Sequence, residues 1–75
     1  MTSQDDLLAY LRTQNASRST IEIVKHFAPN IEPWDITAAR SSVYGRLAAM
    51  TRRGLVRHRA VLGRTGIEAR WEAVA

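Results

Sequence analysis

Arginine supplies most of the side chains in this sequence that are suited to binding chemistry. Of the eleven basic residues ten are arginine, and Lys25 is the only lysine. The guanidinium group presents its N–H donors in a planar fork, which matches the geometry of phosphate groups and of guanine. Residues 40–75 carry eight arginines and two glutamates, a net charge of +6, whereas residues 1–39 carry three basic and five acidic residues, a net of −2. A positive field confined to one half favours a polyanionic partner, with an ordinary solvated surface as the alternative.

The residue types give little indication of disulfide bonds, metal binding or catalysis. Cysteine is absent, so disulfides, thiol catalysis and cysteine-ligated zinc are excluded. His26 and His58 lie far apart in the sequence without an acidic pair at ligand spacing, so we expect no metal site and no cofactor. No nucleophile, base and orienting acid predict a hydrolytic triad, and no glycine-rich loop resembles a nucleotide cradle. We therefore expect a binding protein and not an enzyme.

The length of 75 residues predicts a single domain over residues 1–75. No segment is long and apolar enough to cross a bilayer, so we expect no membrane partner. Asp5 and Asp6 stand where a secretory signal would carry positive charge. Together with the absence of cysteine, this indicates a cytoplasmic location.

Two short helices are predicted in the first 30 residues. Ser3 is placed to cap the first helix, and Ser19 is placed to cap the second, where Glu22 completes a capping box. Pro29 ends the second helix. Between the two helices, residues 16–18 form either a short strand or a turn.

A third, longer helix is predicted over residues 36–53, opened by Asp35 or Thr37. Apolar residues at spacings of three and four define its buried side: Ile36, Ala39, Val43, Leu47 and Met50. Gly54 follows where a helix ends in a left-handed residue. Residues 55–61 and 67–74 then predict two strands joined by a turn at 62–66, since apolar and charged residues alternate along the second of them.

This order of elements resembles the winged helix-turn-helix transcription regulators. The resemblance rests on the junction LAAMTRRGLVRH, and the closing GRTGIEARWEAV is most similar to small stand-alone regulators of pilus operons and to comparable phage or plasmid proteins. It implies an α+β fold of three helices followed by a two-stranded β-hairpin wing. It also implies a bacterial or phage regulator of transcription that binds double-stranded DNA, with the third helix in the major groove and the wing, residues 55–74, on the adjacent backbone or minor groove.

Helical geometry indicates which residues face away from the core. Opposite Val43 the third helix carries short and polar side chains, and we expect Arg40, Ser41 and Tyr44 to contact bases. Arg52 is expected to contact phosphate, and the resemblance implies that Arg64 and Thr65 contact DNA at the wing tip. The full set of expected DNA contacts is Thr37, Ala38, Arg40, Ser41, Tyr44, Ala48, Arg52, Arg57, Arg59, Arg64 and Thr65. A solvated helix face and a hairpin protected by its charges are the alternatives.

Two tryptophans and the choice of partner leave alternatives open. Trp71 holds a place similar to the wing tryptophan of winged-helix domains that bind left-handed DNA, but the wing lacks their prolines, and core packing is favoured. Trp34 is either a lid on the core or a partner contact. A module of this size covers on the order of 600–1,000 Å² of DNA, so a partner protein or a weak homodimer would aid occupancy. The alternative function is a winged-helix protein–protein interaction module, such as a phage-encoded inhibitor or a subunit of a regulatory complex.

Overall fold

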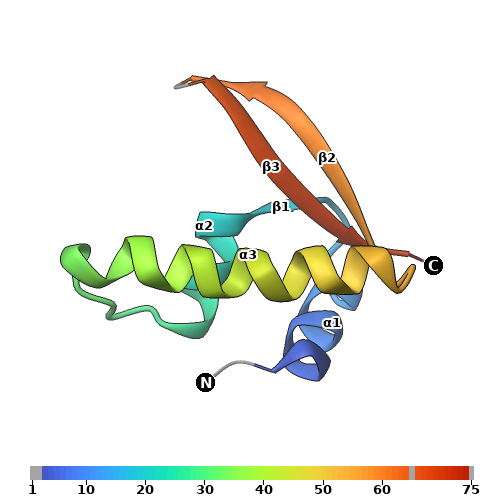
Figure 1. Ribbon diagram of the computed structural model, residues 1–75, viewed down its shortest axis with the longest axis horizontal. Coiled ribbons are helices and arrows are strands. Elements are labelled where there is room, and N and C mark those ends of the chain that lie inside the picture. Colours follow the sequence, from blue (N-terminus) through green and yellow to red (C-terminus); the bar gives the residue numbers. More distant parts are fainter. Residues whose placement is uncertain (1–2, 65, 75) are drawn as a thin grey trace.

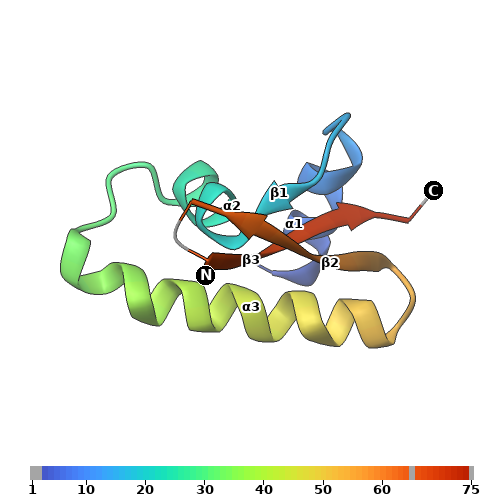
Figure 2. The same ribbon diagram turned by 90° about the horizontal axis from the view of Figure 1, so that it is seen from above.

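The computed structural model describes residues 3–64 and 66–74, which form three α-helices, one 3₁₀ turn and three strands. In chain order these are α1 (Gln4–Arg12), β1 (Arg18–Ser19), α2 (Thr20–Phe27), η1 (Pro33–Asp35), α3 (Ile36–Arg52), β2 (Val56–Gly63) and β3 (Gly66–Ala73). The helix α3 runs along the length of the molecule, and the hairpin of β2 and β3 rises from its C-terminal end (Figure 1). Seen from above, α3 runs along one side of the molecule and α2 and β1 lie toward the other side, with the hairpin drawn across the middle of the view (Figure 2).

Both short helices begin at the serines that the sequence predicts as caps. The Ser19 hydroxyl accepts a hydrogen bond from the Glu22 backbone N–H at 3.2 Å, and the Glu22 carboxylate accepts one from the Ser19 backbone N–H at 3.2 Å. Ser3 and Asp6 form the same reciprocal pair at the start of α1. The capping box predicted for α2 is therefore confirmed, and α1 has one as well.

The third helix has nearly the predicted bounds. It begins after Asp35, whose side chain makes no capping hydrogen bond, and it ends at Arg52. Gly54 then adopts the left-handed conformation with φ +78°, and the Leu55 backbone N–H donates to the Met50 carbonyl oxygen at 3.0 Å. This closure turns the chain directly into β2 and so fixes where the hairpin leaves α3.

The prediction of a two-stranded wing is wrong, because the sheet has three antiparallel strands in the order β1-β3-β2. In the added pairing Arg18 lies opposite Trp71, and Ser19 lies opposite Arg70. The physical reason is that a residue that caps the N-terminus of a helix has extended backbone angles. Ser19 has φ −75° and ψ 161°, so this one residue is both the last residue of β1 and the cap of α2. The resulting α+β arrangement is compatible with a small winged-helix-like domain.

The strands of the hairpin also run further toward the tip than the sequence predicts. Gly63 pairs with Gly66, so the connection is two residues long in place of the predicted turn at 62–66. Gly66 has φ +121°, a conformation that side-chain-bearing residues rarely adopt, which explains how so short a turn is made. Leu62, expected to begin the turn, instead pairs with Ile67, the first residue of the predicted second strand.

The core lies where α1, α2 and α3 meet the base of the sheet. The buried apolar residues are Leu7, Leu11, Ile23, Val24, Val43, Leu47, Met50, Val56 and Trp71. Trp71 is only 1% exposed, and its indole N–H donates to the Thr20 hydroxyl at 2.9 Å, so the predicted core packing of this tryptophan is confirmed. Ile23 of α2 is fully buried.

Candidate functional site

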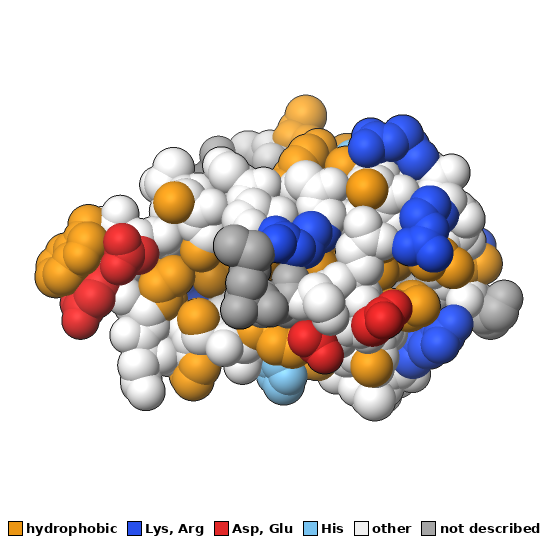
Figure 3. All heavy atoms as spheres, turned by 60° about the horizontal axis from the view of Figure 1, so that its bottom comes forward, with side chains coloured by type: hydrophobic (Ala, Val, Ile, Leu, Met, Phe, Trp, Pro, Cys, Tyr) orange, Lys and Arg blue, Asp and Glu red, His pale blue; other side chains and the backbone are white. Residues whose placement is uncertain are grey.

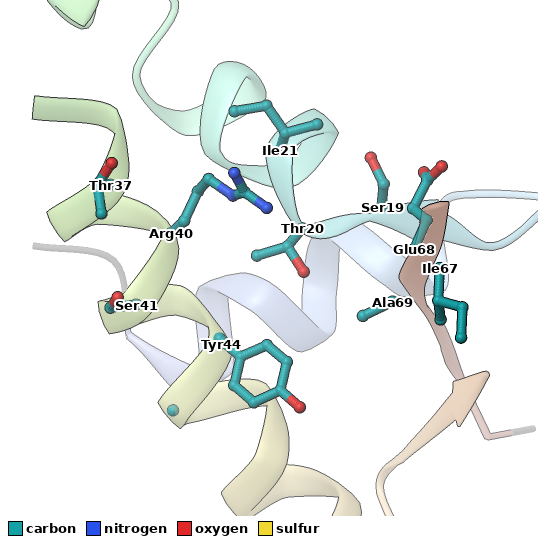
Figure 4. A pocket seen from close by; sticks show the side chains of 11 residues that line it. Ser19, Thr20, Ile21, Thr37, Arg40, Ser41, Tyr44, Ile67, Glu68 and Ala69 are labelled. Atoms are coloured by element: carbon teal, nitrogen blue, oxygen red, sulfur yellow. The ribbon is translucent and has the colours of Figure 1, made fainter. Parts of the chain in front are cut away.

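A cleft of about 750 Å³ opens between α3 and the hairpin. The hairpin departs from the C-terminal end of α3 and diverges from it, so the cleft faces the N-terminal half of that helix (Figure 1). Three elements line it: Ser19, Thr20 and Ile21 from the start of α2, Thr37, Arg40, Ser41, Tyr44 and Gly45 from α3, and Ile67, Glu68 and Ala69 from β3 (Figure 4). The α3 wall is thus mostly polar, while the β3 wall is mostly apolar.

Tyr44 ties α3 to the hairpin beside this cleft. Its ring meets the Trp71 ring edge-on, with centroids 5.3 Å apart and an interplanar angle of 81°. The ring of His58 stacks on Trp71 at 4.5 Å, so the tryptophan is held from two sides. Tyr44 remains 45% exposed and extends from α3 toward the hairpin (Figure 4). The phenol is therefore positioned by an aromatic contact while part of its surface stays open to a partner.

Arg40 is the cation of the cleft. Its side chain reaches from α3 toward the start of α2 (Figure 4). Within the part of the chain that the structure describes, no hydrogen bond or ion pair engages its guanidinium. The hydroxyl groups of Thr37 and Ser41 line the same wall. An unpaired guanidinium beside hydroxyl donors is a suitable environment for an anionic oxygen.

The predicted contact residues of α3 fall into two groups. Thr37, Arg40, Ser41 and Tyr44 line the cleft together. The others do not line it: Ala38, Ala48 and Arg52, of which the first and last are exposed and Ala48 is half-buried. Helical geometry places these three on the outer side of α3, next to Ser41. The predicted set therefore spans one wall of the cleft and the adjoining outer surface of the helix.

Gly45 lies in the cleft although it was not among the predicted contacts. A Cβ atom added there would meet no other atom within 4 Å, so packing inside the protein does not require a glycine. Glycine in the middle of a helix costs about 0.5–1 kcal/mol relative to alanine. Glycine at this exposed position of a 17-residue helix leaves the backbone open to close approach. The signal in the sequence is a glycine halfway along the side of the helix that faces away from the core, at a position where a helix-forming residue is expected.

The hairpin arginines differ in how far they are engaged. Arg57 forms an ion pair with Glu72 at 3.4 Å, and 63% of its side chain is exposed. Arg59 and Arg64 are exposed, and no ion pair to either is found within residues 3–64 and 66–74. Thr65, predicted as a tip contact, lies outside the described residues. Arg59 and Arg64 are therefore the hairpin cations most available to a partner.

Arg70 has a structural role. Its guanidinium donates to the Ser17 carbonyl oxygen at 2.7 Å and to the Ser17 hydroxyl at 3.0 Å, and so fixes the segment that precedes β1. It also forms ion pairs with Glu68 at 2.9 Å and with Glu22 at 3.4 Å. These contacts explain why Arg70, unlike Arg64, is only partly exposed.

Glu22 is held in its charged form by its neighbours. Burial on its own raises the pKa of this carboxyl group, but hydrogen bonds from Ser19 and the charges of Arg70 and Arg18 outweigh that effect. The net result is a pKa lowered from 4.5. The carboxylate thus joins the cap of α2 to the arginine that secures β1.

Charge is also distributed unevenly over the rest of the surface. On the face shown in Figure 3, most Lys and Arg side chains gather toward the end of the molecule where α3 terminates, with some acidic side chains beside them, while other acidic side chains lie at the opposite end. Trp34, in η1 before the start of α3, is 76% exposed, so it does not cover the core as a lid. Its flanking acids Glu32 and Asp35 are exposed as well.

No grouping of three or more His, Cys, Asp or Glu side chains suited to a metal ion occurs in the described part of the chain. Among the same residues, none of the helices combines the length and apolar character needed to span a membrane. Comparison of the chain with protein-family models, curated proteins and solved structures found no match. The function is therefore inferred from the chain's own residues.

Proposed function

We propose that this protein binds double-stranded DNA sequence-specifically and regulates transcription in the cytoplasm by occupying its site. In this proposal α3 enters a major groove, and the β2–β3 hairpin, the wing, lies on the adjacent backbone or minor groove. The observation that carries the proposal is the cleft between α3 and the wing, with the unpaired Arg40 and the hydroxyl groups of α3 along one wall.

The dimensions of DNA fit this arrangement. A helix with its side chains is about 10–12 Å across, and the major groove of B-DNA is about 12 Å wide. When α3 lies in a major groove, the ridge of phosphates beside that groove enters the cleft, and the wing reaches the minor groove on its far side. Arg40, Ser41 and Tyr44 then reach base edges, and Arg52 meets phosphate.

Four exposed arginines border this interface without an ion pair in the described residues: Arg40, Arg52, Arg59 and Arg64. Each phosphate contact releases condensed counterions, which makes the affinity depend steeply on salt. If all four contact phosphate, the slope of log K against log salt concentration is about −3.6. Arg40 at a base edge would reduce the slope to about −2.7.

The test is fluorescence anisotropy with arbitrary duplexes and with duplexes selected from a random pool. Arg64→Ala is expected to weaken binding to all sequences by a similar factor, whereas Arg40→Ala should also relax the preference among them. The matched control is Arg12→Ala, which removes an exposed arginine from α1, away from the cleft. Absence of binding at low salt, or an equal loss in the Arg12 variant, contradicts the proposal.

One observation favours the alternative of a protein–protein interaction module. Trp34 is exposed between two acids, which is typical of a protein contact and unfavourable beside phosphates. If neither arbitrary nor selected duplexes bind at low salt, the protein–protein interaction module becomes the better-supported function. A Trp34→Ala variant that binds DNA like the wild type agrees with a DNA interface at the cleft and not at η1.

A further inference from the structure

The tip of the wing carries an exposed pair of aliphatic side chains. Leu62 is 86% exposed and Ile67 is 81% exposed, and they lie directly opposite each other on β2 and β3. Ile67 also lines the cleft, so the pair belongs to the face of the hairpin that looks toward α3. Apolar surface exposed to this degree contributes nothing to the core, which points to a partner outside the chain.

The tip is narrow and stands away from the rest of the molecule. Beyond the pair formed by the buried Trp71 and the exposed His58, the strands continue for four residues to the aliphatic pair. At about 3.3 Å per residue this is a projection of about 13 Å. The next pair consists of Gly63 and Gly66, which add no side chains to the width. Such a tip fits a narrow groove better than a flat surface.

The charges around the tip favour a polyanion. Arg64 lies in the two-residue turn, and Arg59 lies on the same strand as Leu62; both are exposed. The nearest carboxylate, Glu68, is engaged by Arg70 at 2.9 Å. An aliphatic pair near the unpaired Arg64 matches the minor groove of DNA, where phosphates line the rim and apolar side chains can insert between stacked bases.

We propose that Leu62 and Ile67 act as a wedge that enters the minor groove, partly unstacks one base step and bends the duplex. This inference rests on the proposed DNA binding and adds a mechanical function to it. Apolar wedges of this kind kink DNA by about 20–90°. The wing would then contribute to site selection, because sequences that unstack easily are deformed at lower cost.

The experiment measures the bend and the affinity on the same complex. Energy transfer between dyes at the two ends of a short duplex reports the bend, and anisotropy reports binding. The wild type is expected to raise the transfer efficiency. The double variant Leu62→Ser/Ile67→Ser, whose changes lie outside the core, should stay folded by circular dichroism and bind without raising it. The matched control is Val61→Ser, which alters an apolar residue on the opposite face of the same strand and should bend DNA like the wild type.

A second measurement uses a duplex with one central mismatch, which is already easier to unstack. The wild type should bind it about tenfold more tightly than the matched duplex, and the double variant should bind both alike. If the wild type binds DNA but neither bends it nor prefers the mismatched duplex, the wedge is refuted while the proposed DNA binding stands. The exposed pair at the tip would then be assigned to a protein partner. Failure of the wild type to bind any duplex overturns the proposed function as well.

Discussion

Replacing Gly45 by alanine is expected to stabilise the protein and to weaken its function at the same time. The position is exposed in the middle of α3, and an added Cβ has no neighbour within 4 Å. The stability gain is therefore that of removing glycine from a helix interior, about 0.5–1 kcal/mol. For a domain of this size that corresponds to a rise in Tm of about 2–8 °C.

The same methyl group should interfere with the proposed DNA binding. A helix that nearly fills the major groove leaves little clearance where its surface comes closest to the bases. Gly45 lies on that surface next to Ser41, so a side chain there forces α3 outward and lengthens the contacts on both sides. We expect Gly45→Ala to lose about tenfold in affinity, or about 1.4 kcal/mol. Gly45→Gln should lose more, although glutamine is also a good helix former.

Thermal unfolding by circular dichroism gives the stability, and anisotropy on one duplex gives the affinity. Ala9→Gln is the matched control, since Ala9 is an exposed position of α1. A Gly45→Ala variant that is stabilised and binds DNA as tightly as the wild type would refute the close approach. A variant with a lower Tm would refute the claim that the fold does not need glycine here.

Three further predictions concern the framework that positions the cleft. Thr20→Val leaves the buried indole N–H of Trp71 without its acceptor, and urea unfolding should show a loss of about 1–3 kcal/mol; a loss below about 0.5 kcal/mol contradicts this. Because folding lowers the pKa of Glu22 from 4.5, the stability from this group is present above about pH 4.5 and is lost as the pH falls through the folded value. Glu22→Gln should remove that part of the difference between unfolding at neutral and at acidic pH, and an unchanged difference would exclude it. Gly54→Ala places a side chain at φ +78° and should lower stability by about 1 kcal/mol or more, while an unchanged Tm would contradict the strain.

The helices could be predicted from the sequence because their signals are local. The capping box of Ser19 and Glu22 lies within four residues, and Gly54 marks the end of α3 directly. For the segment that contains the start of β1, the sequence left a strand or a turn open over residues 16–18 and indicated no pairing partner. The two residues of β1 make no periodic pattern, and they pair with residues about fifty positions further along the chain, at Arg70 and Trp71. Only the tertiary fold brings the two segments together.

The features of the candidate site that could not be predicted from the sequence also depend on the tertiary fold. Helical geometry shows that Tyr44 and Ser41 share a side of α3, but it does not give the angle at which the hairpin leaves the helix. That angle places Tyr44 against Trp71, so a residue expected on the open face takes part in an aromatic contact with the sheet. Likewise, the sequence places Arg64 at the hairpin tip and Arg70 on the returning strand, but it does not show that Arg70 contacts Ser17. The contact of Arg70 with Ser17 separates a structural arginine from an available one.

Three residues at which the sequence departs from what folding favours, Gly45, Leu62 and Ile67, lie around one cleft. A sequence selected for stability alone would have alanine in place of Gly45, and polar residues in place of Leu62 and Ile67 at the wing tip. Gly45 and Ile67 line the same cleft from opposite walls, and Leu62 is the strand partner of Ile67. Local costs of folding that cluster in this way are expected at functional sites, where they are offset by binding. The aromatic contact between Tyr44 and Trp71 holds the two walls of the cleft in a fixed relative position. A partner that enters the cleft therefore contacts the helix and the wing together.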